Sequence, residues 1–95
     1  MAALVEEYTA VTIISEKSEE IRQAIIGDLG RGVTIYKGRG GLSDAEQDIL
    51  FSVMTRLEIG RVKTVTHKFD QQAFIVIHSL ARVDGGVIKK LALHA

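Results

Sequence analysis

The chain is expected to fold as one α+β domain of the ferredoxin-like class, an antiparallel sheet with two helices on one face. The first observation that predicts this fold is the order of the apolar patterns, which runs β-α-β-β-α-β along the sequence. The second is the size of the chain, because 95 residues with a 46% hydrophobic share are enough for one core.

The first half of the pattern begins with a strand and a helix. Residues 10–15 are mostly apolar and β-branched, which is typical of a buried strand. Ser15 or Ser18 is placed to cap the following helix, whose first turn is acidic. Gly30 and Gly32 are typical of a helix C-terminus. The apolar stripe of this helix is Ile21, Ala24, Ile25 and Leu29.

The middle of the chain predicts two more strands and a second helix. Residues 33–37 alternate between two faces, as expected of a strand. A glycine-rich loop then leads, through a brief helical turn starting at Ser43 or Asp44, into a third strand over residues 48–57. Residues 58–69 have apolar side chains at helical spacing and form the second amphipathic helix.

The last part of the chain contains the fourth strand, residues 73–79, after a turn at residues 70–72. Residues 82–95 predict only a short helix or a tail. The expected organisation is a linker or N-terminal extension over residues 1–8, one ferredoxin-like domain over residues 9–88 and a C-terminal tail over residues 89–95.

The third and fourth predicted strands are apolar on both of their faces. In the ferredoxin-like arrangement, however, both helices cover the same face of the sheet, which leaves the other face open. A contiguous apolar face on so small a monomer usually marks an interface. We therefore expect a homo-oligomer packed through the open sheet face, or cover of that face by the chain ends.

The loop between the second and third strands is the first candidate binding site. Its glycines lack a Cβ, so they can take positive φ and present backbone N–H groups to a small anionic ligand or nucleotide. The alternative is a flexible connection between strands, because the loop matches no phosphate-binding signature. The predicted ligand-binding residues are Lys37, Gly38, Arg39, Gly40, Gly41 and Ser43.

Composition argues against several other functions. Twelve acidic and twelve basic residues balance, so no global field favours nucleic acid, and we expect no nucleic-acid partner. Cysteine is absent, and His67, His78 and His94 are too scattered for a metal site, so we expect no metal and no cofactor. No catalytic constellation is present, and we expect no enzymatic activity. No apolar run is long enough to span a membrane.

Several short motifs together resemble one known family. They are Ile14-Ser15, Glu19-Glu20-Ile21, Arg31-Gly-Val-Thr, Gly38-Arg-Gly-Gly-Leu-Ser, Val53-Met54-Thr55-Arg56, and Asp70 followed by Ala73-Phe74. With these motifs, residues 8–86 resemble the C-terminal cytoplasmic domain of the bacterial YitT-type membrane proteins, a domain of unknown function. The chain departs from the family's usual tyrosine at Leu42, its proline at Gln71 and its Gly-x-Gly-Phe ending at Gly85-Gly86-Val87.

The resemblance implies a fragment that is soluble by itself and belongs to the cytoplasmic face of the bacterial inner membrane, next to the membrane-spanning region of its parent protein. The order of elements is also similar to that of PII-type signalling proteins, which oligomerise and bind nucleotides near the corresponding loop. These similarities lead to the hypothesis of a regulatory domain that senses a small anionic, nucleotide-like ligand at residues 37–43. The alternative is a ligand-free oligomerisation module that assembles the membrane region.

Overall fold

The computed structural model of the chain describes residues 8–80 and 83–84. It has the predicted β-α-β-β-α-β order, with a π-helical turn (η1) after the first helix and a 3-10 turn (η2) before the second. The elements are β1 (Tyr8–Ile14), α1 (Ser18–Ala24), η1 (Ile25–Leu29), β2 (Thr34–Arg39), β3 (Glu46–Thr55), η2 (Arg56–Glu58), α2 (Ile59–Phe69) and β4 (Phe74–Ser79). Of the extension predicted over residues 1–8, residues 1–7 lie outside the described residues and Tyr8 already begins β1. The tail predicted over residues 89–95 also lies outside the described residues.

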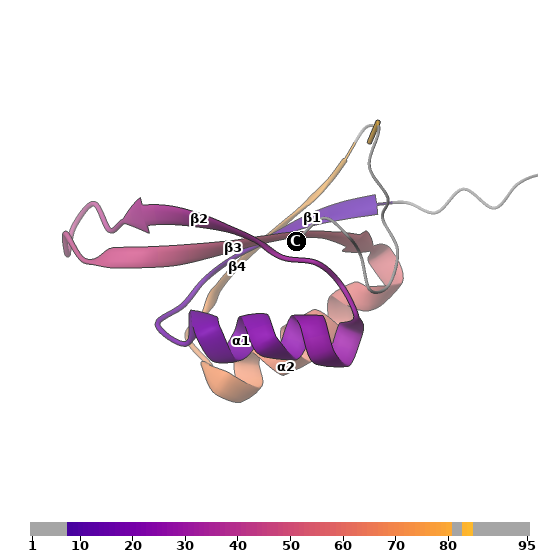
Figure 1. Cartoon of the computed structure of the whole chain (residues 1–95), viewed down its shortest axis with the longest axis horizontal. Coiled ribbons are helices and arrows are strands. Elements are labelled where there is room, and N and C mark those ends of the chain that lie inside the picture. Colours follow the sequence, from indigo (N-terminus) through magenta and orange to yellow (C-terminus); the bar gives the residue numbers. More distant parts are fainter. Residues whose placement is uncertain (1–7, 81–82, 85–95) are drawn as a thin grey trace, which may run out of the picture.

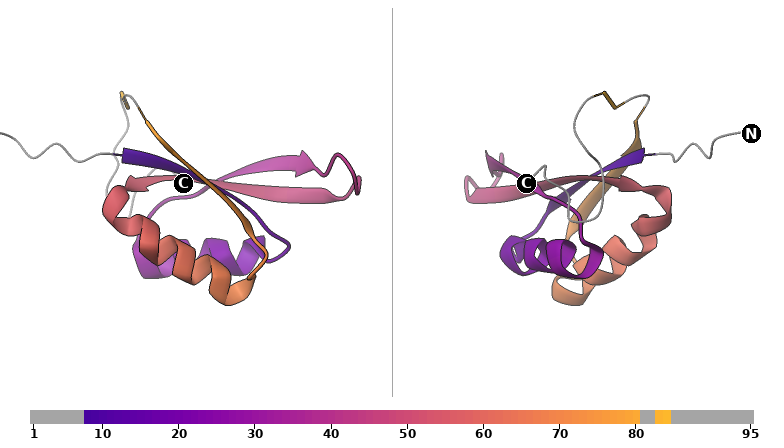
Figure 2. Two further views of the ribbon diagram at one scale, coloured as in Figure 1. Left: turned by 180° about the vertical axis from the view of Figure 1, so that it is seen from behind. Right: turned by 45° about the vertical axis from the view of Figure 1, so that its right-hand side comes forward.

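The four strands form one antiparallel sheet in the order β2-β3-β1-β4. The register places Ile13 of β1 between Leu50 of β3 and Ile75 of β4. Both helices lie against the same face of this sheet, and the views in Figures 1 and 2 agree on this arrangement. The predicted ferredoxin-like fold is therefore confirmed.

The core lies between the helices and one face of the sheet. Alternate residues of β1 and β3 point toward the helices, so the period of two in each strand meets the helical stripes. Of the stripe predicted for the first helix, Ile21, Ile25 and Leu29 are buried. The whole buried cluster is Val11, Ile13, Ile21, Ile25, Leu29, Val33, Leu50, Met54 and Val62.

The first helix ends as the sequence predicts at one glycine, but it begins differently. Gly30 has a left-handed φ of 68°, and its N–H donates to the carbonyl oxygen of Ile26 at 3.1 Å. At the start, Lys17 holds the N-cap position without a side-chain cap, so neither predicted serine fills that role. Ser15 Oγ instead accepts the Lys17 N–H at 2.9 Å, within the turn that precedes the helix.

A buried ion pair joins the end of the first helical segment to the start of the second. Arg31 and Glu58 are 7% and 8% exposed, and the guanidinium donates to the Glu58 carboxylate from Nε at 2.9 Å and from Nη2 at 2.7 Å. The same carboxylate accepts the Thr55 N–H and hydroxyl, each at 3.0 Å. These bonds begin the 3-10 turn at Thr55, which explains why β3 ends there rather than at the predicted Leu57.

Candidate functional site

The predicted site lies on a hairpin, residues 37–48, which we name the β2–β3 arm. β1 pairs with β3 only from Ile49 to Thr55, so residues 46–48 have β2 as their single partner. The arm therefore continues beyond the helices, at the left of Figure 1. It carries all of the predicted ligand-binding residues.

The tip of the arm is a tight turn that contains no helical segment, so the predicted helical turn at Ser43 or Asp44 is wrong. Asp44 N–H donates to the Gly40 carbonyl at 2.9 Å, and Gly40 N–H donates to the Ala45 carbonyl at 2.9 Å. Ser43 Oγ accepts the Ala45 N–H at 3.2 Å. Asp44 itself has a left-handed φ of 63°, a conformation that stops a right-handed helix.

The loop glycines allow close packing instead of forming an anion cradle. A Cβ on Gly38 would lie 2.7 Å from Ile49 Cδ1, and a Cβ on Gly40 would lie 2.5 Å from Ser43 Oγ, whereas Gly41 faces open space. Gly38, Gly40 and Gly41 all lack the positive φ that we expected. The Gly40 N–H is also already bonded within the turn. The predicted nest of backbone donors is therefore not formed.

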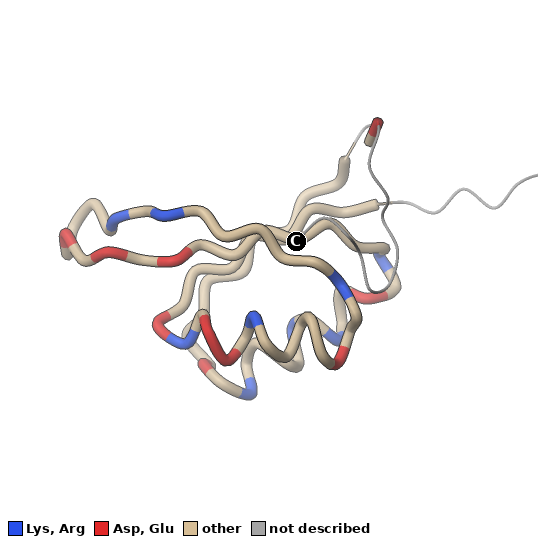
Figure 3. The backbone as a smooth tube through the Cα atoms, in the orientation of Figure 1, with Lys and Arg blue, Asp and Glu red and all other residues tan. Residues whose placement is uncertain are grey.

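The two predicted cations of the arm are each paired with a carboxylate. Lys37 Nζ lies 2.7 Å from Asp48 Oδ1, and Arg39 Nε lies 3.0 Å from Asp44 Oδ1. Figure 3 shows the basic residues along one side of the arm and the acidic residues along the other. The hydrogen bond to Asp48, reinforced by Coulomb attraction, raises the pKa of Lys37 above its ordinary value. Solvent screens both pairs, because the Lys37 side chain is 83% exposed.

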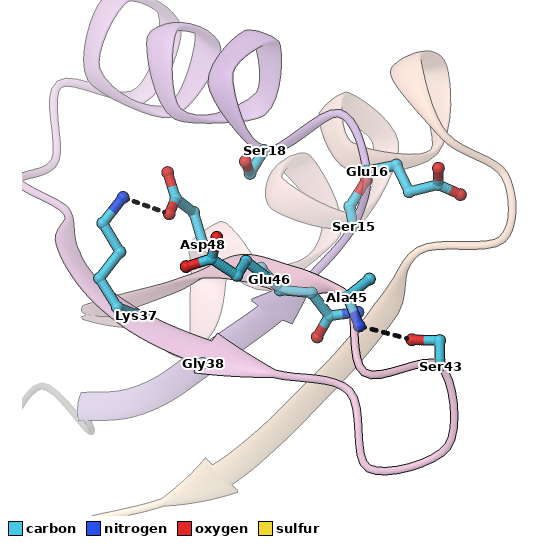
Figure 4. A pocket seen from close by; sticks show the side chains of 10 residues that line it. Ser15, Glu16, Ser18, Lys37, Gly38, Ser43, Ala45, Glu46 and Asp48 are labelled. Atoms are coloured by element: carbon cyan, nitrogen blue, oxygen red, sulfur yellow. Dashed lines mark hydrogen bonds and ion pairs between the residues drawn. The ribbon is translucent and has the colours of Figure 1, made fainter.

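A cleft of about 750 Å³ lies beside the arm, between its helix-facing side and the turn from β1 to α1. Figure 4 shows Lys37 and Asp48 pointing toward each other across it, with Ser18 nearby. Three predicted residues line the cleft, namely Lys37, Gly38 and Ser43, whereas Arg39, Gly40 and Gly41 do not. The other lining residues are Ser15, Glu16, Ser18, Ala45, Glu46, Gln47 and Asp48.

The turn from β1 to α1 was not predicted to belong to the site. Ser15 Oγ donates to Asp70 Oδ2 at 2.6 Å and thereby ties this turn to the one after α2. That bond and a further bond from the Gln72 N–H hold the pKa of Asp70 below its ordinary value. The sequence signal was weak, because a serine beside a strand end is equally typical of a helix cap.

The charge of the cleft differs from what an anion site requires. Three carboxylates line it, on Glu16, Glu46 and Asp48, against the single ammonium of Lys37. Among the described residues, no group of three or more acidic or histidine side chains is arranged to hold a metal ion. A simple anion would therefore meet a net negative surface, whereas a ligand that carries its own cation would not.

The second candidate surface is the sheet face opposite the helices, which we name the open face. Three cross-strand rows cross it, and none of their side chains is acidic, Lys or Arg. Tyr36 and Phe51 contact each other on it, with ring centroids 5.9 Å apart. From β2 to β4 the rows are Tyr36, Ile49, Ile14, Phe74; then Thr34, Phe51, Thr12, Val76; then, from β3, Val53, Ala10, His78.

Large apolar side chains are exposed on the open face. Phe74 is 63% exposed, Tyr36 is 51% exposed and Val76 is 38% exposed. Neither α1 nor α2 lies on this side of the sheet (Figure 1). The predicted apolar open face is therefore present among the described residues.

Comparison with known proteins relates this chain to bacterial membrane proteins. It is 33% identical over 76 residues to the UPF0750 membrane protein YxkD of Bacillus subtilis (strain 168), covering 80% of this chain and 27% of that protein. It is 29% identical over 62 residues to the membrane protein YitT of the same strain, covering 65% and 22% respectively. The chain thus spans about a quarter of the length of these relatives, and no helix among its described residues is long and apolar enough to cross a bilayer.

A solved structure supports the same relationship at the level of the fold. It is a DUF2179 protein from Eubacterium ventriosum, 25% identical, which covers 75% of this chain and 97% of its own with a TM-score of 0.66. The family described as "Uncharacterized protein conserved in bacteria (DUF2179)" matches residues 31–85, which begin at the buried Arg31. The predicted likeness to the YitT-type domain is confirmed, and the chain belongs to the DUF2179 family.

Proposed function

We propose that this chain is a non-catalytic assembly domain on the cytoplasmic side of a bacterial membrane protein, and that it self-associates through the open face. The observation that carries the proposal is the apolar open face, on which Phe74, Tyr36 and Val76 of the two edge strands are exposed. Removing such side chains from water is favourable by about 25 cal/mol per Å² of apolar area. The absence of cysteine agrees with a reducing cytoplasm.

A second copy of the chain suits this face because its three rows contain no Asp, Glu, Lys or Arg side chain to repel an identical face. Seven residues of β1 pair across the sheet, and at about 3.3 Å per residue and 4.8 Å per strand the four strands present roughly 400 Å² per copy. A pair would bury roughly 800 Å² in total, which is below the range of about 1,200–2,000 Å² for stable specific complexes. We therefore expect weak association of the free domain.

Membrane attachment would strengthen such weak association. The relatives are named membrane proteins, and copies held in one bilayer have a high effective concentration without any additional contact. On this proposal, the open face is the element that turns the proximity of parent proteins into a defined assembly.

Charging the open face tests the proposal. We expect Phe74→Lys to weaken self-association by about 100-fold, because one aromatic contact is lost and an ammonium must be desolvated. The measurement is sedimentation equilibrium over a series of protein concentrations. Leu57→Lys is the matched control, since Leu57 is equally apolar and 93% exposed but lies in η2, away from the open face.

Two results would contradict self-association through this face. One is a monomeric mass for the unmodified protein at every concentration, including when it is tethered to a vesicle surface. The other is equal association of the Phe74→Lys and Leu57→Lys variants. If deletion of residues 85–95 created an oligomer from a monomer, the chain's own C-terminus would be the cover instead.

Ligand sensing at the β2–β3 arm is the second candidate function, and the cleft beside the arm favours it. Because the cleft carries three carboxylates and one ammonium, the nucleotide that fits is one complexed with a divalent cation. Lys37 would contact a phosphate, and Glu46 or Asp48 would face the cation. Ser43 would supply a hydroxyl from the far side of the cleft.

A thermal-shift comparison tests this second candidate. We expect ATP with Mg²⁺ to raise the unfolding temperature, and ATP with EDTA to have little effect, because the carboxylates repel the free polyanion. Lys37→Gln should abolish the shift, whereas Lys17→Gln, on the adjacent turn outside the cleft, should leave it unchanged. An equal shift in both variants would exclude the arm cleft as the nucleotide site.

A further inference from the structure

A second cleft, of about 480 Å³, lies between α2 and the edge strand β4, on the side of the molecule away from the arm tip. Its charge is opposite to that of the arm cleft, because it is lined by cationic side chains and by no carboxylate among the described residues. Lys63 is the cation that we assign to a ligand, since Arg56 already has an interaction partner. The lining residues are Thr9, Arg56, Ile59, Lys63, Ile77, His78 and Ser79.

The edge of β4 directs backbone donors outward beside this cleft. Leu80 N–H donates to the Tyr8 carbonyl at 3.3 Å, so Leu80, and two residues before it His78, turn their backbone groups toward β1. The N–H and C=O groups of Ile77 and Ser79 must then both point away from β1. No described strand pairs with β4 on that side. Two outward N–H groups therefore lie on residues that line the cleft.

Thr9 contributes an unsatisfied hydroxyl to the wall of the cleft. It is 3% exposed, and its Oγ1 has no hydrogen-bond partner among the described residues. The register places Thr9 opposite Ser79, on the helix-facing side of the sheet, where Lys63 and Ile59 of α2 also line the cleft. A buried hydroxyl without a partner is unfavourable, and a rotation of the Thr9 side chain toward the cleft would let a ligand oxygen satisfy it.

We propose that the cleft between α2 and β4 binds a phosphoryl group. Its donors come from three elements, namely the Lys63 ammonium on α2, the Ile77 and Ser79 N–H groups on the edge of β4 and the Thr9 hydroxyl on β1. A tetrahedral dianion accepts hydrogen bonds from several directions at once and carries the charge that an ammonium attracts. Ile59 and Ile77 offer apolar contact to whatever the phosphoryl group is attached to.

Titration with inorganic pyrophosphate, followed by the amide signals of the 15N-labelled protein, tests the proposal. We expect saturable shifts at Ile77 and Ser79. Lys63→Gln should weaken binding by about tenfold, the effect of losing one charge-assisted hydrogen bond. Lys68→Gln, in the last turn of the same helix and outside the cleft, should bind as the unmodified protein does.

A pair of threonine variants separates ligand binding from folding. Thr9→Val and Thr66→Val each remove a buried hydroxyl without a partner, so neither should lower stability through a lost hydrogen bond. Only Thr9 lines the cleft, so only Thr9→Val should weaken pyrophosphate binding. The proposal is overturned if pyrophosphate causes no saturable shift and phosphatidylglycerol vesicles do not bind the protein. It is equally overturned if the Lys63→Gln and Lys68→Gln variants bind pyrophosphate with the same affinity.

The phosphoryl group could belong to a soluble phosphate ester or to a lipid headgroup, and vesicles distinguish these sources. Sedimentation with phosphatidylglycerol vesicles that is lost in Lys63→Gln would assign a lipid. Saturable pyrophosphate shifts without vesicle binding would assign a soluble ligand. Sedimentation at equal levels with phosphatidylcholine and phosphatidylglycerol vesicles, without pyrophosphate shifts, would overturn the proposal. The oligomer measurements on Phe74→Lys are independent of each of these outcomes.

Discussion

Replacing Glu58 with alanine is expected to lower the free energy of unfolding by about 3–5 kcal/mol, the usual cost of leaving a buried charge unpaired. Arg31 would lose its partner while 93% of its surface stays buried, since it is 7% exposed. Thr55 would lose the acceptor for its N–H and its hydroxyl. For a domain whose total stability is typically about 5–15 kcal/mol, this is a large fraction. Urea unfolding followed by circular dichroism measures it.

The matched control is Glu19→Ala, which breaks the exposed ion pair with Arg22 and should change stability little. A double-mutant cycle with Arg31→Met and Glu58→Gln should give a coupling energy above about 1 kcal/mol, because the two side chains share several hydrogen bonds. Equal losses in the free energy of unfolding for Glu58→Ala and Glu19→Ala would show that the buried ion pair stabilises the fold no more than the exposed pair does.

The same residue predicts how stability depends on pH. Burial raises the pKa of Glu58, but the hydrogen bonds from Arg31 and Thr55 outweigh burial and leave it below the ordinary value of 4.5. The stabilisation by the carboxylate is therefore complete above pH 4.5 and is lost as pH falls through the lower pKa of the folded state. We therefore expect the free energy of unfolding of Glu58→Gln to fall less on acidification than that of the unmodified protein. Asp70 should still contribute pH-dependent stability in this variant, because the hydrogen bond from Ser15 lowers the pKa of Asp70 too.

Two neighbouring isoleucines of β1 should separate the two faces of the sheet. Ile13 is 1% exposed in the core, and we expect Ile13→Ala to cost about 2–5 kcal/mol through lost burial and a cavity. Ile14 lies on the open face between Ile49 and Phe74. Ile14→Ala should cost less in folding but should weaken self-association, whereas Ile13→Ala should not weaken association in the folded fraction.

Urea unfolding and sedimentation equilibrium on the same two variants make this comparison. The opposite assignment, with association lost in Ile13→Ala and retained in Ile14→Ala, would contradict the proposed interface. Equal folding costs would show that the open face is covered as thoroughly as the core within a single chain.

The arrangement of strands and helices was predictable because it depends on local periodicity. β-branched runs indicated the strands, and the stripe of Ile21, Ile25 and Leu29 indicated the first helix and its buried side. The end of β3 was also readable in principle, since Thr55-Arg-Leu-Glu58 has the spacing of a capping box. Leu57 extends the apolar run past Thr55 and so masks that signal.

The details of the candidate site were not predictable, because they depend on register and on distant packing. Lys37 meets Asp48 and Arg39 meets Asp44 only in this hairpin register, and no local pattern announces these pairs. Arg31 and Glu58 are 27 positions apart in the sequence, and they meet only once the two helices are placed. The glycines of the loop correctly predicted a turn, but Gly38, Gly40 and Gly41 do not have the positive φ expected of them.

The single ladder that holds the β2–β3 arm has a consequence for exchange with solvent. Residues 46–48 pair only with β2, while residues 49–51 pair with β2 on one side and with β1 on the other. Backbone amides of the arm should therefore exchange with deuterium through local opening, and those of central β3 only when the whole domain unfolds. The arm can thus open or bend at little cost while the sheet stays intact, so a partner or ligand can reposition it without disturbing the fold.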